Sequence, residues 1–354
     1  MKLVFFGLSI TSSWGNGHAS TYRGLLRALH RGGHHLTFFE RNVEWYASNR
    51  DLPSAPFARI RPYTAWPEIK DAALAAVRDA DAVVVGSFFP DAIALLDSAL
   101  GHGRAKICFY DIDTPITVKD LGEGACTYLR ADHIPALDIY LSFTGGPLLT
   151  ELERRWGARR AAPLYCSCDP QGIIEDDGER RAEVTLSYMG TFTPDRQAKF
   201  RRLFLAPAER LSEAQFLVAG PLFPAVARWP RNVRYQYHLS PREHATFYRS
   251  SQFTINLTRQ AMAEAGYSPS IRLFEAAAHG VPIITDCWPG LEEFFAPGTE
   301  VLTANEADDV VRHLRTTTPP RRRQLAAAAR LRLLNQHTPD HRAQALEGYL
   351  QALA

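Results

Sequence analysis

Short apolar runs alternate along the chain with segments whose apolar residues recur at helical spacing. The chain opens with a predicted strand at 2–9, a helix at 21–31 and a second strand at 36–40. This unit is the usual opening of a doubly wound parallel sheet. The same pattern predicts further strands at 58–61, 82–86, 106–110, 139–143 and 162–166, with helices at 67–80, 91–100 and 148–156.

Residues 169–183 are polar and charged and are predicted to form a linker. Because 354 residues exceed the usual size of one core, we expect two doubly wound α/β domains, at 1–170 and 184–335, and a terminal helix within 336–354. The second series predicts strands at 184–189, 216–219, 233–237, 253–257, 281–285 and 301–303, and helices at 197–211, 242–250, 308–315, 321–335 and 341–353.

The stretch at 267–295 reads YSPSIRLFEAAAHGVPIITDCWPGLEEFF and predicts a loop, a helix and a buried strand. Ser268 and Ser270 suit the start of the helix, and Arg272 and Glu275 then share one helix face. An arginine at a helix N-terminus favours a phosphate, and a carboxylate one turn further accepts hydrogen bonds from a ribose. The pattern indicates a nucleotide or nucleotide-sugar site, with a solvated ion pair as the alternative.

A polar loop follows the first strand and reads TSSWGNGH, residues 11–18. Gly15, Asn16, Gly17 and His18 fall where a strand's carboxyl end meets a helix, the edge at which open α/β sheets bind ligands. The loop is not GxGxxG. The dinucleotide fingerprint is therefore absent, which argues against an oxidoreductase.

Composition is that of an ordinary globular protein, with 46% apolar residues and a net charge of +2. This balance gives no reason to expect a nucleic-acid partner. Clusters such as Arg321-Arg322-Arg323 are interpreted as solvated helix faces, and a peripheral membrane contact through them stays open. Five cysteines without zinc-like spacing, and a chain that opens with a strand in place of a signal segment, predict a cytoplasmic protein with reduced thiols.

The second half resembles the GT-B glycosyltransferases and, within them, the CgeB-like (spore-maturation) group. The residues that carry the resemblance are SIRLFEAAAHG at 270–280, Thr285-Asp286, GLEEFF at 290–295, and Gly298 with Glu300-Val301. GLSITSSWGNGHASTYRGLLRAL at 7–29 and Tyr188-Met189-Gly190-Thr191-Phe192 are also similar to this group.

The resemblance implies two Rossmann-like domains, with a nucleotide-sugar donor in the second and the acceptor mainly in the first. The terminal helix would cross back onto the first domain. It further implies transfer of a sugar from a nucleotide-diphosphate sugar to the hydroxyl of a glycan, a lipid-linked or a small-molecule acceptor, without metal or cofactor. Glu275 takes the place of the glutamate that holds the donor ribose, and Arg272 lies near the diphosphate.

Eleven residues are expected on the donor side. Arginines and free backbone N–H groups would stabilise the departing diphosphate, the nucleobase would lie at the ends of neighbouring strands, and hydroxyl groups would contact sugar or phosphate. These residues are Gly190, Thr191, Arg196, Gly220, His238, Arg259, Tyr267, Ser268, Ser270, Arg272 and Glu275. Retaining relatives often carry another glutamate where this chain has Tyr267, so retaining and inverting outcomes both stay open.

An inverting transfer needs a base for the proton of the acceptor hydroxyl, and His18 and Asp111 are the candidates. Gly15, Asn16, Gly17 and Asp113 are expected on the acceptor side, with helix capping as the alternative for His18 and Asp113. Asp111-Ile112-Asp113 has the Asp-x-Asp spelling but lies in the first half, so no metal site is predicted. A nucleotide-sugar epimerase, a non-catalytic nucleotide-sugar binding protein and a dehydrogenase are the rival functions.

Overall fold

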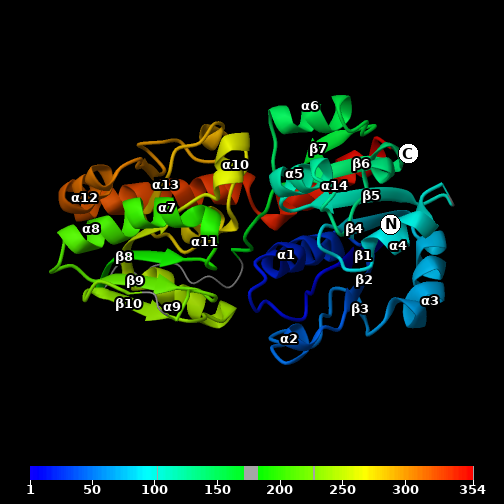
Figure 1. Cartoon of the computed structure of the whole chain (residues 1–354), viewed down its shortest axis with the longest axis horizontal. Helices are drawn as coiled ribbons and strands as arrows, with labels where there is room; N and C mark the ends of the chain where they lie inside the picture. The colour runs from blue at the N-terminus through cyan, green and yellow to red at the C-terminus, as the bar shows by residue number, and fades with distance from the viewer. Residues whose placement is uncertain (102, 171–181, 226–227, 354) are drawn as a thin grey trace. The chain divides into compact units, whose positions relative to one another are not determined.

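The computed structural model describes the chain apart from residue 102, residues 171–181, residues 226–227 and residue 354 (Figure 1). The chain forms two compact units. Unit 1 comprises Met1–Ser167 and Pro339–Ala354, and unit 2 comprises Cys168–Thr338. Most of the predicted linker at 169–183 lies outside the described residues.

Unit 1 is built on a seven-stranded parallel sheet of order β3-β2-β1-β4-β5-β6-β7. Phe5 of β1 pairs with Phe38 of β2 on one side and with Val84 of β4 on the other. Side chains of these central strands are buried on both faces, as expected where helices cover a parallel sheet. The strands are β1 (Lys2–Gly7), β2 (His35–Arg41), β3 (Arg59–Tyr63), β4 (Ala82–Gly86), β5 (Lys106–Asp111), β6 (Ile139–Ser142) and β7 (Ala161–Pro163).

The last helix of the chain belongs to unit 1. It packs beside the first helix, α1, and Glu347 accepts a hydrogen bond from Nε2 of His34 at 2.7 Å. Tyr349 donates to the carbonyl of Pro163 at 2.9 Å, which ties the same helix to β7. The helices of unit 1 are α1 (His18–Arg31), α2 (Glu44–Ala47), α3 (Trp66–Asp79), α4 (Ala92–Ala99), α5 (Thr114–Gly122), η1 (Ala131–Ala136), α6 (Pro147–Arg154) and α14 (Pro339–Gln351).

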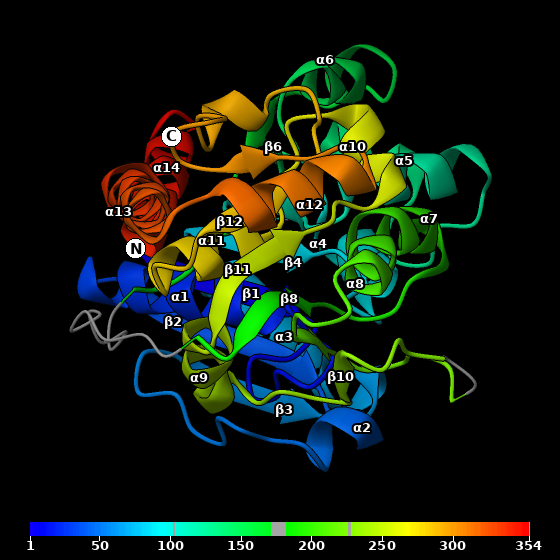
Figure 2. The same ribbon diagram turned by 90° about the vertical axis from the view of Figure 1, so that its left-hand side faces the viewer.

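Unit 2 repeats the plan with a six-stranded parallel sheet of order β10-β9-β8-β11-β12-β13. Helices cover the sheet, and α8 and α12 pack side by side (Figure 2). The strands are β8 (Val184–Met189), β9 (Phe216–Ala219), β10 (Val233–Gln236), β11 (Ser251–Asn256), β12 (Ile283–Thr285) and β13 (Leu302–Thr303). The helices include η2 (Pro194–Arg196), α7 (Gln197–Phe200), α8 (Ala206–Arg210), η4 (Pro241–Glu243), α9 (His244–Arg249), α10 (Gln260–Ala265), α11 (Ile271–Ala278), η5 (Leu291–Glu293), α12 (Ala307–Thr316) and α13 (Pro319–Gln336).

The prediction of two doubly wound parallel sheets is confirmed, and both sheets reverse their strand order at one place, β1/β4 and β8/β11. Ligands of such sheets bind outside the carboxyl ends of the strands at this reversal. The predicted helix at 197–211 is confirmed from Gln197 to Arg210, but Pro207 lacks an amide hydrogen and disturbs the regular α-helical bonding. A π-helical turn, Arg201–Leu205, separates α7 from α8. The short helices α2, α5 and α10 were not predicted.

Candidate functional site

Arg196 lies at the carboxyl end of the unit 2 sheet and is 5% exposed. Its Nη1 donates to the hydroxyl of Tyr188 at 3.0 Å and to the carbonyl of Thr191 at 3.2 Å, while its buried Nε has no hydrogen-bond partner among the described residues. Both acceptors are neutral. The guanidinium is therefore held firmly in place without neutralisation of its charge.

Arg272 is the second cation of this edge and sits in the first turn of α11. Ser270 caps the helix, because its hydroxyl accepts the N–H of Arg272 at 3.3 Å. Nη2 of Arg272 donates to the carbonyl of Leu257 at 3.3 Å, and its buried Nε has no hydrogen-bond partner in the part of the chain that the structure describes. Burial lowers the pKa of Arg272 and the positive charge of Arg196 lowers it further, while Tyr188, Tyr248 and Glu275 act in the opposite direction. The charge of Arg196 is therefore near enough to act on Arg272.

No carboxylate lies within ion-pair distance of Arg196 or Arg272 among the residues that the structure describes. Lys199, another cation of unit 2, differs from the two arginines because it forms an ion pair with the buried Asp286 at 2.7 Å. The carboxylates of Glu275 and Asp195 are near enough to interact electrostatically with Arg272 and Arg196, respectively, but neither forms an ion pair with them. Two largely buried positive charges that lack a direct ion-pair partner in the described part of the chain are costly for a fold. Guanidinium groups are well suited to phosphate oxygens, so this pair, which we call the arginine pair, fits a di-anionic ligand.

Glu275 lies one turn along α11 from Arg272 and is 8% exposed. The hydroxyl of Tyr248 donates to its Oε2 at 3.4 Å, and Nδ1 of His244 lies 3.8 Å from its Oε1. Burial and then the charge of Glu275 raise the pKa of Tyr248, so this hydroxyl stays protonated. The long contacts leave the carboxylate able to accept a further hydrogen bond, as the proposed ribose contact requires.

Gly190 and Gly220 bring the ends of β8 and β9 into close approach beside the arginine pair. A Cβ atom on Gly220, whose φ is +145°, would lie 2.1 Å from the carbonyl oxygen of Gly190. A Cβ atom on Gly190 would lie 2.6 Å from the Tyr188 hydroxyl and 3.2 Å from Nη1 of Arg196. The structure therefore brings Gly190, Thr191, Arg196 and Gly220 together as predicted, and only glycine fits at two of these positions.

Other residues predicted on the donor side have structural partners. Arg259 pairs with Asp195 at 3.1 Å, so its charge is neutralised. Tyr267 has a φ of +49°, and its ring covers Gly290, where a Cβ atom would lie 2.4 Å away. Ser268 is buried. The carbonyl of His238 accepts a hydrogen bond from Nε2 of Gln236 at 3.4 Å. Glu264, in a different helix from Glu275, is exposed and bonded to Gln260.

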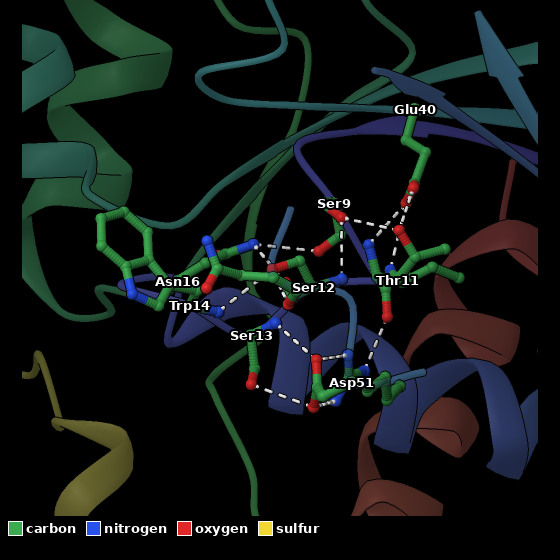
Figure 3. Close-up of polar contacts among 11 residues, drawn as sticks. Ser9, Thr11, Ser12, Ser13, Trp14, Asn16, Glu40 and Asp51 are labelled. Carbon is green, nitrogen blue, oxygen red and sulfur yellow. Dashed lines mark hydrogen bonds and ion pairs between the residues drawn. The ribbon is translucent and has the colours of Figure 1, made fainter. Parts of the chain in front are cut away.

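The polar loop of unit 1 is organised by two carboxylates that the sequence did not single out (Figure 3). Glu40, at the end of β2, accepts the N–H groups of Ile10 and Thr11 at 2.8 and 3.2 Å, as well as the Thr11 hydroxyl. Asp51 accepts the N–H and the hydroxyl of Ser13 at 2.8 and 3.0 Å. Both carboxylates therefore bind the loop itself.

Arg23 completes this network from α1. It forms a bidentate ion pair with Asp51, at 2.8 and 2.9 Å, and its Nε donates to the carbonyl of Ile10 at 2.7 Å. Asn16, which is 3% exposed, donates through Nδ2 to the carbonyl of Ser9 at 2.9 Å, and its Oδ1 has no partner within the described ranges of the chain. These contacts fix the loop and present Asn16 as an acceptor. We call residues 9–17 the anchored loop.

The predicted catalytic and acceptor-side residues fall into two groups. Gly15, Gly17 and His18 are exposed or partly exposed at the start of α1, with the His18 ring 6.4 Å from that of Phe88. Asp113 precedes α5, and its carbonyl accepts the N–H of Ile116 at 2.8 Å. These residues line the carboxyl edge of the unit 1 sheet, as the sequence indicated.

Asp111 does not fit the predicted role of catalytic base. It is fully buried, and its oxygens accept hydrogen bonds from Tyr140 at 2.5 Å and from Thr117 at 2.9 Å. Burial raises the pKa of Asp111, although these hydrogen bonds oppose the change. A base must reach the proton that it removes. The geometry instead assigns Asp111 to holding the turn between β5 and α5.

The described residues contain no group of three or more His, Cys, Asp or Glu side chains arranged to hold a metal ion. None of the described helices combines the length and the apolar character that a membrane-spanning segment requires.

Comparisons with known proteins agree with this geometry. The profile of the glycosyl transferase-like family matches residues 196–348, which include both arginines and Glu275. Sucrose-phosphate synthase from Thermosynechococcus elongatus superposes with a TM-score of 0.73 at 13% identity, over 99% of this chain and 98% of that chain. HepE of Anabaena, in complex with UDP and glucose, superposes with a TM-score of 0.71 at 10% identity, over 99% of this chain and 100% of that chain.

The galactosyltransferase WaaB of the lipopolysaccharide outer core, in its apo form, gives a TM-score of 0.63 at 14% identity over 100% of both chains. No curated protein matches the sequence. The chain therefore has the GT-B fold of two Rossmann-like domains, and its residues 196–348 match the glycosyl transferase-like family.

Proposed function

We propose that the protein is a glycosyltransferase that moves a sugar from a nucleoside-diphosphate sugar to an acceptor hydroxyl. The observation that carries this proposal is the arginine pair, two adjacent guanidiniums without a carboxylate partner in the described residues, next to Glu275. A diphosphate supplies the missing negative charge, and the carboxylate accepts from the ribose. The match of residues 196–348 to the glycosyl transferase-like family and the UDP bound to HepE support the same reading.

In this mechanism Arg196 and Arg272 stabilise the charge that develops on the departing nucleoside diphosphate. Fixed cations in a partly buried site achieve this without reorganisation during the reaction. Because two guanidiniums provide the charge, we propose that transfer needs no metal ion. His18 is our candidate for the base on the acceptor side, since it is partly exposed whereas Asp111 is buried. Within the fold, the CgeB-like group is the family that we propose.

The dehydrogenase alternative loses support from Glu40. In dinucleotide-binding folds, an acidic residue downstream of the glycine loop binds the ribose of the cofactor. Here the carboxylate of Glu40 accepts two N–H groups and a hydroxyl of its own loop. The carboxylate that would bind a cofactor ribose is therefore already bonded to the protein's own loop.

A panel of nucleotide sugars tests the proposal. We expect calorimetry to detect binding of a free nucleoside diphosphate, and chromatography to detect its release from one donor when acceptors are supplied, with activity retained in excess chelator. Glu275→Gln is expected to weaken nucleotide binding about tenfold, because a ribose contact is lost. An intact donor under every acceptor condition would indicate a binding protein. A changed sugar on an intact nucleotide would indicate an epimerase.

A further inference from the structure

An exposed indole stands on the segment that follows β2. Trp45 lies on α2 and is 54% exposed, whereas most large aromatic side chains of unit 1 are buried. The ring of Tyr46 lies 5.9 Å from it at an interplanar angle of 63°. We call residues 42–52 the α2 arm. An exposed tryptophan on a well-anchored segment is a binding candidate, because a large flat surface is available at little cost in conformational entropy.

The α2 arm is bonded directly to the anchored loop (Figure 3). Backbone N–H groups of Asp51 and Leu52 both donate to the carbonyl of Thr11, at 3.1 and 3.0 Å. The hydroxyl of Ser12 donates to the carbonyl of Asn49 at 2.8 Å. The two segments therefore form one scaffold, and whatever binds the arm is held in register with the loop.

Asn49 and Arg50, near the end of α2, carry planar polar groups. Nδ2 of Asn49 donates to the carbonyl of Trp45 at 2.8 Å and fixes the end of α2. Arg50 donates to Thr11 through Nε at 3.3 Å and to Asn42 through Nη2 at 2.6 Å. A guanidinium carries five N–H donors. Arg50 uses only Nε and Nη2 in hydrogen bonds to the described residues, so other N–H donors remain available to a ligand.

The arm carries one net negative charge, because Glu44 and Asp51 outnumber Arg50. A segment of this charge with a single exposed indole lacks the basic cluster that an anionic membrane surface requires. It also lacks the extended apolar patch that is typical of a protein interface.

We propose that the α2 arm is an acceptor subsite in which the indole of Trp45 stacks on a pyranose ring. A pyranose combines an apolar C–H face with hydroxyl groups at its edge, and it suits a flat aromatic surface on a segment that also carries hydrogen-bonding side chains. The arm offers the indole of Trp45 and the polar side chains of Asn49 and Arg50. The inference rests on the proposed function and deepens it, because it identifies the acceptor as an oligosaccharide or glycoside of more than one sugar unit.

Binding to an array of oligosaccharides of two to six sugar units, printed beside the matching monosaccharides, tests this subsite. We expect the full chain to bind at least one oligosaccharide more tightly than its monosaccharide. Trp45→Ala should weaken that binding about tenfold, and Trp45→Phe should weaken it less, because an aromatic face remains. Leu331→Ala, a change at a side chain of α13 in unit 2 that is 60% exposed, is the matched control and should have no effect.

The controls separate this inference from the donor proposal. UDP binding by calorimetry and the melting temperature should be the same in Trp45→Ala and the wild type, so failure of donor binding would not affect the glycan result. Binding of no glycan, or equal binding by Trp45→Ala, would overturn the subsite. So would Trp45-dependent binding to phosphatidylglycerol vesicles or Trp45-dependent dimerisation in light scattering without glycan binding, since either would assign the indole to another partner.

Discussion

The anchored loop of unit 1 and the arginine pair of unit 2 each lie at the carboxyl edge of a parallel sheet. They differ in whether their charged side chains form ion pairs and hydrogen bonds within the protein. In the loop, Arg23 is matched by Asp51, and Glu40 is satisfied by three donors of the loop. At the other edge, within the described part of the chain, Arg196 and Arg272 donate only to neutral acceptors, and each has a buried Nε without a hydrogen-bond partner. The polar groups of the anchored loop bond to one another, so this region is a structural scaffold. The arginine pair keeps unpartnered donors, which indicates where a ligand could bind.

The largest effect is expected from Arg272→Met, which removes one charge of the pair and keeps much of the side-chain volume. Affinity for UDP should fall about 100-fold, the equivalent of ~2.7 kcal/mol, because charge-assisted contacts to phosphate are lost. The melting temperature should not fall, since an uncompensated charge is removed. Calorimetry and thermal unfolding measure the two quantities.

Arg322→Met is the matched control for this change. Arg322, on α13, is also a partly buried arginine of unit 2. Its Nη1 donates a hydrogen bond to Oε1 of Gln252 at 2.9 Å. Its replacement should leave UDP affinity unchanged. If Arg272→Met destabilised the fold strongly and bound UDP normally, the contrast between scaffold and binding site would be wrong.

Glu40→Gln should show the opposite pattern. The amide introduces N–H donors where the loop already presents donors, so we expect a loss of about 2 kcal/mol of unfolding free energy. Chemical denaturation would measure this loss. UDP affinity of the folded fraction should stay at the wild-type value, and a nucleotide-binding defect without destabilisation would contradict the scaffold role of Glu40.

The smallest effect concerns pH. Burial acts to raise the pKa of Asp51, but the hydrogen bonds and charge of Arg23 outweigh it and lower the pKa from 3.8 to about 2. Because the folded-state pKa is depressed, the stabilising contribution is present above about pH 4 and is lost as the pH falls towards 2. Solvent screening limits it to about 1 kcal/mol. Denaturation at several pH values should show a weaker acid dependence in Asp51→Asn than in the wild type.

Local sequence patterns predicted the helix that carries Arg272 and Glu275. A serine cap, an apolar face and a terminal glycine all lie within a dozen residues, so no knowledge of the strand order is needed. The neighbourhood of Arg196 could be inferred only in part. Its electrostatic influence on Arg272 depends on β8 and β11 being adjacent, and that adjacency is a property of the whole sheet.

Glu40 and Asp111 show why other parts of the site could not be predicted. Both residues end an apolar strand, so both looked alike in the sequence. Glu40 meets the loop after β1 because β1 and β2 are neighbours, whereas Asp111 meets the Tyr140 hydroxyl because β5 and β6 are neighbours. Only the tertiary structure decides which carboxylate faces a loop and which is enclosed in the core.

The placement of α14 has a consequence for synthesis of the protein. Because Pro339–Ala354 complete unit 1, the whole of unit 2 is inserted, in the topological sense, within unit 1. A ribosome that works from the N-terminus therefore delivers every residue of unit 2 before it delivers the helix that packs against α1. The domain whose chain begins first is the one that finishes last, and until then α1 keeps part of its apolar surface exposed.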